Sequence, residues 1–243
     1  MSTPAPTPTP RRGTRKKERT RRELLVAAID AIAAEGEAVT VLDVTRRAEV
    51  SNGTFYNYFA DREALIDAVI DEVVGTFTTT MAEIVEHEDP ALRFATITAL
   101  LFEHAAAFPQ LATVMLRLDA MRRPETWREA PLRPLGDDLA QGALTGRFDR
   151  EPSAAVVDLV TGTMFRALRR IASDEHDATA EHRSEVIALL LRGLGLDPDE
   201  AETLSAVAVA AAPDIHRAHV DRALDPVLAQ AAPSTPSAPG ADR

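Results

Sequence analysis

The 243-residue chain contains no cysteine, which excludes disulfide bonds, thiolate metal sites and a cysteine nucleophile. Uncharged stretches such as 203–213 are far shorter than the roughly 18 apolar residues that a membrane span needs. The proline-rich first ten residues and the basic run after them lack the apolar core of a secretory signal. We therefore expect a cytoplasmic protein with no membrane anchor.

Positive charge is in the minority, because 27 basic residues face 38 acidic ones and give a net charge of −11. On this average a polyanionic partner is not expected, since nucleic-acid affinity comes mostly from neutralised phosphates. The distribution is uneven, however: residues 11–22 contain eight basic residues and one acidic residue, a local charge of +7. This run is either a solvated helix face or an arm that contacts DNA phosphates through residues such as Arg15, Lys16 and Lys17.

Period-2 alternation is also missing, while apolar residues recur at spacings of three and four, which predicts an all-α fold. The first helix is expected over 14–35, with later helices starting near Thr40, Ser51 and Asp61. Prolines 90, 109, 124 and 131 are expected where helices begin or bend. The last helices are expected as a pair over 198–212 and 214–230, on either side of Pro213.

Four of the chain's 11 aromatic residues fall within five positions: Phe55, Tyr56, Tyr58 and Phe59. On a helix that starts near Ser51, Phe55 and Phe59 share one face, which predicts that both pack in the core. The two tyrosines lie among side chains that commonly reach phosphates and base edges, namely Asn52, Thr54, Asn57 and Arg62. We therefore expect both tyrosines to be contact residues.

The stretch VTVLDVTRRAEVSNGTFYNYFADREALIDAVI, residues 39–70, resembles the helix-turn-helix of the TetR family of bacterial transcription regulators. The resemblance implies an N-terminal three-helix DNA-binding domain over 14–60, with a connecting helix from residue 61. It further implies a larger helical ligand-binding and dimerisation domain over 61–230. The segments 1–13 and 231–243, rich in proline and small residues, are expected to be disordered tails.

By the same resemblance, the helix over 51–58 enters the major groove of a double-stranded operator. The implied DNA contacts are Thr40, Ser51, Asn52, Gly53, Thr54, Tyr56, Asn57, Tyr58 and Arg62. Two positions depart from the family pattern. Glu49 stands where the turn usually has glycine, which strains a left-handed turn by about 1 kcal/mol or forces another geometry. Leu42 replaces a polar base-contacting residue found in some relatives, so the contacts of its helix are expected to be limited to phosphates.

Two later segments, 142–170 and 185–196, resemble the helices that pair across a two-fold axis in relatives. Their apolar stripes predict a homodimer, which would supply two recognition helices for two half-sites. The alternative is that these stripes are ordinary internal core. The interface candidates are Val156, Leu159, Val160, Thr163, Ala167, Val186 and Leu190.

The larger domain is also expected to bind a small hydrophobic effector, because large and adaptable apolar side chains recur along its helices. The candidates for the pocket are Phe94, His104, Phe108, Met115, Trp127, Met164 and Phe165. His104 would either orient the effector or be a satisfied core histidine. His216 and His219 lack a third ligand and are interpreted as surface residues, so no metal and no cofactor is expected.

No catalytic constellation is recognisable in the sequence, so an enzyme is not expected. The resemblance implies a repressor that leaves its operator when the effector binds. A regulator that responds to a protein partner, or that acts without an effector, remains open as the alternative.

Overall fold

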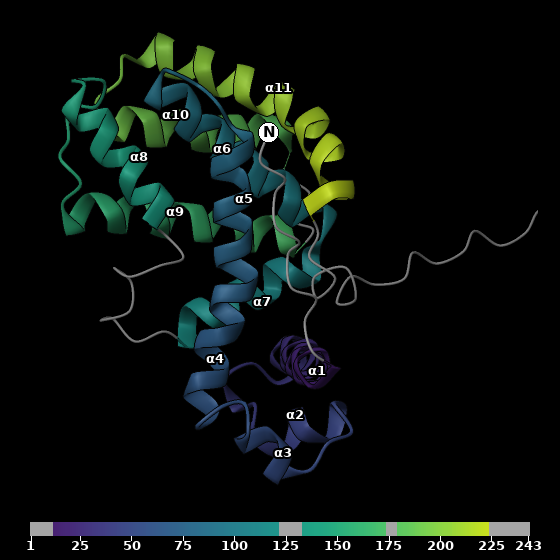
Figure 1. The fold of residues 1–243 in the computed structure, drawn as a ribbon. Coiled ribbons are helices and arrows are strands. Elements are labelled where there is room, and N and C mark those ends of the chain that lie inside the picture. The colour runs from purple at the N-terminus through teal and green to yellow at the C-terminus, as the bar shows by residue number, and fades with distance from the viewer. Residues whose placement is uncertain (1–11, 122–132, 174–178, 224–243) are drawn as a thin grey trace, which may run out of the picture.

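The computed structural model describes residues 12–121, 133–173 and 179–223, and every regular element within these ranges is helical (Figure 1). The expected all-α class is confirmed. Leu24, Ile29, Phe55, Phe94 and Leu118 are among the fully buried side chains of a hydrophobic core that extends through both ends of the molecule.

The N-terminal helices form a small group at one end of the molecule. Helix α1 (Arg12–Glu35) is followed by a single 3-10 turn (Gly36–Ala38), α2 (Val41–Arg47), α3 (Asn52–Tyr56) and α4 (Arg62–Ile70). Helix α1 packs against α2 and α4. It begins two residues earlier than expected, so residues 12 and 13 belong to a helix and not to a disordered tail. The remainder of the two expected tails lies outside the described residues.

A continuous helical rod connects this group to the rest of the chain. Helix α4 runs into a π-helical turn, η2 (Asp71–Gly75), which runs directly into α5 (Thr76–Ile84). Figure 1 shows the rod rising from α2 and α3 into the larger group of helices. Val69, Val73 and Phe77 along it are buried, so the rod is part of the core at both ends.

The larger group surrounds α6 (Pro90–Ala107), a mostly apolar helix that contacts α7, α8, α9, α10 and α11. The other bounds are α7 (Pro109–Met121), α8 (Arg133–Leu144), α9 (Ala154–Ala172), α10 (Ala180–Gly193) and α11 (Pro198–Ala223). As expected, helices begin at Pro90 and Pro109. The other two expected positions, Pro124 and Pro131, lie outside the described residues.

The expected break at Pro213 is wrong, because α11 continues through this residue without interruption. Proline removes one backbone N–H, and the helix beyond it keeps its packing. Ile215 packs against the core, and His216 is hydrogen-bonded to His104 of α6. These contacts hold the second half of α11 in line with the first.

Among the described residues, no single helix is long and apolar enough to cross a membrane. Helices α6 and α7 satisfy the criteria of length and composition only as a pair, and they are bent by 115°.

Candidate nucleic-acid interface and ligand cavity

The short helix α3 is held by its cap and by one buried residue. The Thr54 backbone N–H donates to the Ser51 hydroxyl at 3.1 Å, and the two hydroxyls are 2.9 Å apart. Asn52 accepts a hydrogen bond of 3.0 Å from the buried Thr45 of α2, which ties the two helices together. The amide nitrogen of Asn52 has no partner among the described residues.

The two faces of α3 differ as expected. Phe55 is fully buried and contacts the nearly buried Phe59, with ring centroids 5.6 Å apart. Tyr56 stands edge-on against Phe55 but is 58% exposed, and Asn57 is exposed beside it. Tyr58 is half-buried and packs against the core. One face of α3 is therefore an anchor, and the other is an aromatic and amide surface open to a partner.

Gly53 is exposed on α3, and its lack of a side chain is not required by the protein's own packing. A Cβ atom built there would meet only the Ser51 hydroxyl, at 3.8 Å, and the backbone of Gly53 is not in the left-handed region. Glycine at a helical position costs about 0.5–1 kcal/mol relative to alanine. The packing of the folded chain therefore gives no steric reason for glycine at this position.

The turn between α2 and α3 has the left-handed geometry that the sequence made uncertain. Glu49 has φ +54, a conformation that glycine adopts without strain and glutamate does not. The turn is closed by a hydrogen bond of 3.0 Å from the Val50 N–H to the Thr45 carbonyl. Glu49 is exposed, so its carboxylate lies on the surface between the two helices.

Arg62 and Thr40, both expected to contact DNA, also make hydrogen bonds within the protein. Arg62 donates to the Val39 carbonyl at 2.7 Å and to the Glu37 carbonyl at 2.8 Å, and it pairs with Glu63 at 3.5 Å. Thr40 caps α2 in a capping box with Asp43, whose pKa is lowered by the hydrogen bonds from Thr40. Both residues therefore position the backbone around α2.

Exposed cations nevertheless lie on α1 and α2. Lys16 and Lys17 are exposed on α1, while the side chain of Arg15 lies outside the described residues. Arg21 stacks over the Phe59 ring at 5.7 Å, which joins the basic run to the anchor of α3. The sequence interpretation missed Arg46, an exposed cation in the last turn of α2. Its position just before the turn between α2 and α3 could have identified it as a candidate DNA contact. Leu42, on the same helix, is 46% exposed.

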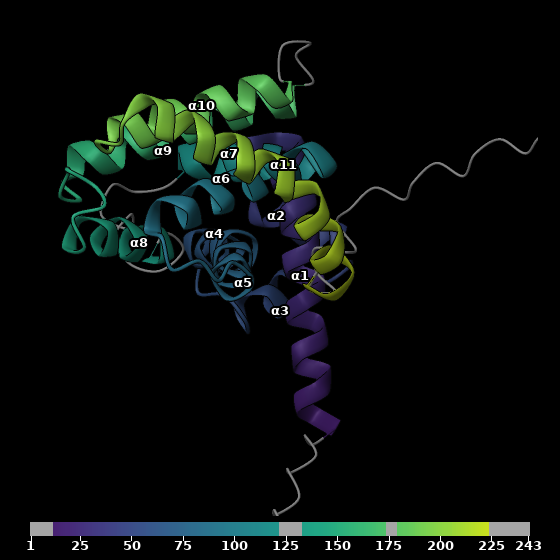
Figure 2. The ribbon, with the colours of Figure 1, turned by 90° about the horizontal axis from the view of Figure 1, so that it is seen from above.

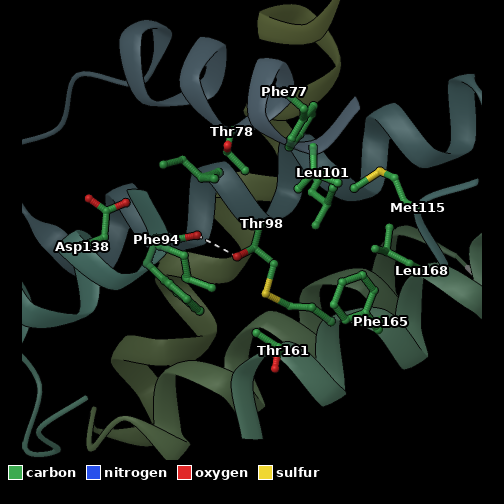
Figure 3. Close-up of a pocket in the computed structure, with 14 residues that line it drawn as sticks. Phe77, Thr78, Phe94, Thr98, Leu101, Met115, Asp138, Thr161, Phe165 and Leu168 are labelled. Atoms are coloured by element: carbon green, nitrogen blue, oxygen red, sulfur yellow. Dashed lines mark hydrogen bonds between the residues drawn. The ribbon is translucent and has the colours of Figure 1, made fainter. Parts of the chain in front are cut away.

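A largely apolar cavity of about 60 Å³ lies in the larger group of helices (Figure 3). Side chains from η2, α5, α6, α7, α8 and α9 line it. They are Val74, Phe77, Thr78, Phe94, Ile97, Thr98, Leu101, Met115, Leu135, Asp138, Thr161, Met164, Phe165 and Leu168. Four expected pocket residues, Phe94, Met115, Met164 and Phe165, are brought together here.

The polar groups of this cavity, which the sequence interpretation missed, offer hydrogen-bond acceptors. The hydroxyls of Thr78, Thr98 and Thr161 each donate to a carbonyl of the preceding turn, at 3.1, 2.8 and 2.7 Å. Their oxygens therefore keep only lone pairs for a guest. Asp138 is ion-paired with Arg93 at 2.8 Å, and burial raises its pKa while Arg93 opposes the rise.

A second, more open hollow of about 680 Å³ lies on the outer side of α9. It shares Thr161 and Phe165 with the inner cavity, so these two side chains form the wall between cavity and surface. The floor of the outer hollow is polar at Asp158, Arg166 and Arg169.

His104 and Phe108 do not line the cavity, which corrects the expectation that they do. The Nδ1 atom of His104 is 3.2 Å from Nε2 of His216, and the His104 ring is packed between Phe77 and Phe108. Burial, assisted by His216, lowers the pKa of His104 to about 4. His216 is half-buried, not a surface residue as interpreted from the sequence. The remaining candidate, Trp127, lies outside the described residues.

The expected dimer interface is partly wrong, because four of its seven residues belong to the chain's own core. Val160, Ala167, Val186 and Leu190 are buried, and Val156 and Thr163 are half-buried. The exposed apolar side chains are Leu159 of α9 and Leu189 of α10, at 48% and 53%. The apolar stripe is wider than one face, so its spacing did not separate the internal side from the external side.

Two elements connect the cavity to the N-terminal helices. Val74, Phe77 and Thr78 of the rod line the cavity, and the same rod contains α4 at its other end. Helix α7 contributes Met115 to the cavity, and two residues later Arg117 donates to the Ile32 carbonyl of α1 at 2.7 Å. A change of shape at the cavity therefore has two direct structural routes to α1 and α4.

No group of three or more His, Asp or Glu side chains in the described part of the chain is placed to hold a metal ion. The described residues bring together two features, an exposed aromatic and amide face on α3 and an apolar cavity in the larger group of helices. With α2 and α3 arranged as helix, turn and helix, these features are typical of a DNA-binding protein that has a separate domain for a small molecule.

Comparisons with known proteins agree with this class. Residues 24–69 match the bacterial regulatory proteins of the tetR family, and residues 89–207 match the tetracyclin repressor-like C-terminal domain. The chain belongs to the TetR family of bacterial transcription regulators. Regulators of this family bind DNA, dimerise and bind small-molecule effectors. No curated protein sequence matches the chain.

Several solved structures share the fold. RolR in complex with resorcinol is 25% identical, with a TM-score of 0.54 over 79% of this chain and 96% of that one. A putative tetR family regulator from Shewanella sp. PV-4 is 19% identical, with a TM-score of 0.64 over 73% and 99%. FadR from Bacillus subtilis, in complex with stearoyl-CoA, is 21% identical, with a TM-score of 0.55 over 70% and 97%.

Proposed function

We propose that this protein is a homodimeric repressor that reads its operator with α3 and leaves it when a small molecule fills the cavity. The observation that carries the DNA-binding part is the division of α3 into a buried anchor, Phe55, and an open face. That face contains Asn52, Gly53, Tyr56 and Asn57, and it gives a base pair access to amide, aromatic and bare backbone groups. As a regulator of bacterial genes, the protein acts in the cytoplasm.

A dimer supplies the second recognition helix that a half-site pair requires. The proposed contact is the outer side of α9 and α10, where Leu159 and Leu189 are exposed. The two helices approach closely there, since a Cβ atom at Gly193 would lie 3.1 Å from the Leu159 side chain. Leu189→Glu should produce a monomer in sedimentation experiments, and a dimer of unchanged affinity would contradict this placement.

The proposed effector is small, mainly apolar and equipped with hydrogen-bond donors. A cavity of about 60 Å³ is well below the roughly 150 Å³ that accommodates benzene, so binding must displace side chains such as Met164 or Phe165. The cavity offers the acceptor oxygens of Thr98 and Thr161 and the carboxylate of Asp138. A phenol or diol meets these requirements, and the similarity to RolR, solved with resorcinol, supports this class.

Effector binding is proposed to act through the rod and α7. A guest that pushes on Phe77 or Met115 moves elements that continue into α4 or hold α1. The spacing of the two recognition helices then changes. The switch requires that the effector binds one spacing more tightly than the other, and the difference in affinity sets the size of the response.

The DNA-binding part is tested by selecting bound sequences from a random duplex pool with the full-length protein. We expect a palindromic site, and a Tyr56→Ala protein with an unchanged melting temperature should lose it. A wild-type protein that enriches no sequence would contradict the proposal.

The effector part is tested with resorcinol and its dimethyl ether, which have similar shapes but differ in their donors. Resorcinol should raise the melting temperature and weaken operator binding, whereas the ether should do neither. Thr98→Val keeps the volume and should reduce the response to resorcinol. Equal responses to both compounds would contradict the requirement for hydrogen-bond donors. If no compound of a broad panel changes the operator affinity, the protein would be a repressor without this effector switch.

A further inference from the structure

The first three turns of α1 extend out of the body of the protein. Helix α1 begins at Arg12, and Leu24 is the first buried residue among those whose side chains are described, from Lys16 on. Figure 2 shows this part of α1, in purple, leaving the other helices behind. The match to the tetR family begins only at residue 24. Residues 12–23, hereafter the basic extension, lie before the matched region and are about 18 Å long at 1.5 Å per residue.

The charges of the basic extension oppose its helical form. Its first turn contains no acidic residue, although the N-terminal end of a helix favours negative charge. Like charges repeat at the i,i+4 spacing in the pairs Arg12–Lys16, Arg15–Arg19 and Lys17–Arg21, and each such pair destabilises a helix.

From Lys16 on, where the side chains of the basic extension are described, the favourable contacts lie at the end that joins the body. Arg19 pairs with Glu23 at 3.4 Å, and Arg21 stacks over Phe59. No described residue pairs with Lys16, Lys17 or Arg22. A helical segment without tertiary packing gains little stability in water, even where it continues a packed helix. Dense negative charge on a partner would offset the repulsion between the cations of the basic extension.

We infer that the basic extension binds the phosphate backbone of duplex DNA next to the half-site, and that this contact holds it in the helical form. This inference takes from the proposed function only that the partner is DNA. It does not need a specific operator, because phosphate contacts do not depend on sequence. A helix is about 10–12 Å wide and does not fit a minor groove about 6 Å wide. The basic extension therefore lies along the backbone instead of entering that groove. Its length corresponds to about five base pairs at 3.4 Å per step.

The experiment compares hydrogen exchange of the amides in residues 12–22 in the full-length protein, alone and with a duplex of scrambled sequence. We expect fast exchange in the free protein and at least tenfold slower exchange on DNA. The Lys16→Gln/Lys17→Gln variant should flatten the slope of log affinity against log salt by about 2, because each lost phosphate contact removes about 0.9. The Arg150→Gln/Arg217→Gln variant has the same net charge, with both exposed substitutions in the larger domain, and should leave the slope unchanged.

Equal protection with and without DNA would overturn the inference, and so would protection by vesicles of anionic lipid but not by the duplex. An unchanged salt slope in the Lys16→Gln/Lys17→Gln variant would do the same. This outcome is separable from that of the proposed function. If the protein selects no operator sequence but scrambled DNA protects the basic extension, only the present inference is supported. If the protein selects an operator but scrambled DNA does not protect the basic extension, only the proposed function is supported.

Discussion

The two ends of this molecule encode their tasks in different ways. The proposed DNA-reading face lies within a few turns of chain, on α3 and the turn before it, and each side chain is positioned by neighbours close in sequence. The cavity is assembled from elements between Val74 and Leu168, and each contributes only one to four side chains. A local surface can therefore be recognised from a motif. A surface assembled from distant helices can change its chemistry through single substitutions without leaving a motif.

The largest expected effect is the loss of stability when Phe55, which anchors α3 in the core, is truncated. Phe55→Ala removes a fully buried ring and should destabilise the fold by about 3–5 kcal/mol in urea unfolding. Tyr56→Ala, one position later on the exposed face, should leave the unfolding midpoint nearly unchanged and reduce operator affinity roughly tenfold or more. If Tyr56→Ala unfolds the protein instead, the two faces of α3 have been assigned the wrong way round.

The second prediction concerns the assembled end and its histidine pair. The pKa of His104 falls from 6.5 in the unfolded chain to about 4 in the folded protein, because burial disfavours the charged ring. Between pH 6.5 and pH 4, His104 is therefore protonated in the unfolded chain and neutral in the folded protein. The contribution of the neutral His104 to the free energy of unfolding is fully present above pH 6.5. It should decrease by up to about 3 kcal/mol as the pH falls towards 4.

The measurement is urea unfolding at a series of pH values, with wild-type and His104→Gln proteins compared at each pH. The difference between the two proteins isolates His104 from the carboxylates that titrate nearby. Parallel curves would show that this histidine is charged or solvated in the folded protein.

Arg62 tests how far the local surface depends on contacts distant in sequence. Arg62→Ala leaves the carbonyls of Val39 and Glu37 without their donor and should cost about 1–3 kcal/mol of stability. Arg46→Ala is the matched control, because Arg46 is exposed near the same surface and its removal should change stability by less than about 0.5 kcal/mol. Similar melting temperatures for both variants would show that the internal hydrogen bonds of Arg62 contribute little to stability, and Arg62 would then be only a phosphate contact.

The smallest expected effect separates folding from DNA binding at a single position. Gly53→Ala should stabilise the fold by about 0.5–1 kcal/mol, since a Cβ atom has room there and alanine favours the helix. The same methyl group should weaken operator binding if the backbone of α3 approaches DNA closely. Calorimetry and operator titration on the same sample measure both quantities, and a gain in both would contradict the close approach.

The sequence predicted the all-α class, the burial of Phe55 and the exposure of Tyr56, because helical spacing and local capping determine them. It did not reveal partners that are distant in sequence: Arg62 donates to carbonyls 23 and 25 residues earlier. His104 has the spacing of a cavity residue, yet it pairs with His216, 112 residues later. The apolar stripe of α9 was recognised, but a stripe does not state whether its partner is another helix of the same chain or of a second copy.

The π-helical turn η2 sets the phase between the two ends of the molecule. Each residue of an α-helix turns the chain by 100° and advances it by 1.5 Å. The i→i+5 hydrogen bonds of η2 accommodate one residue more than a regular turn, so removing one residue from Asp71–Gly75 would restore a regular helix and leave α4 and α5 close to their present phase. A residue inserted or removed in the regular part of the rod would instead rotate α4 by about 100° relative to the cavity. The rod is therefore a stretch of chain in which a change of length is tolerated at η2 and not on either side of it.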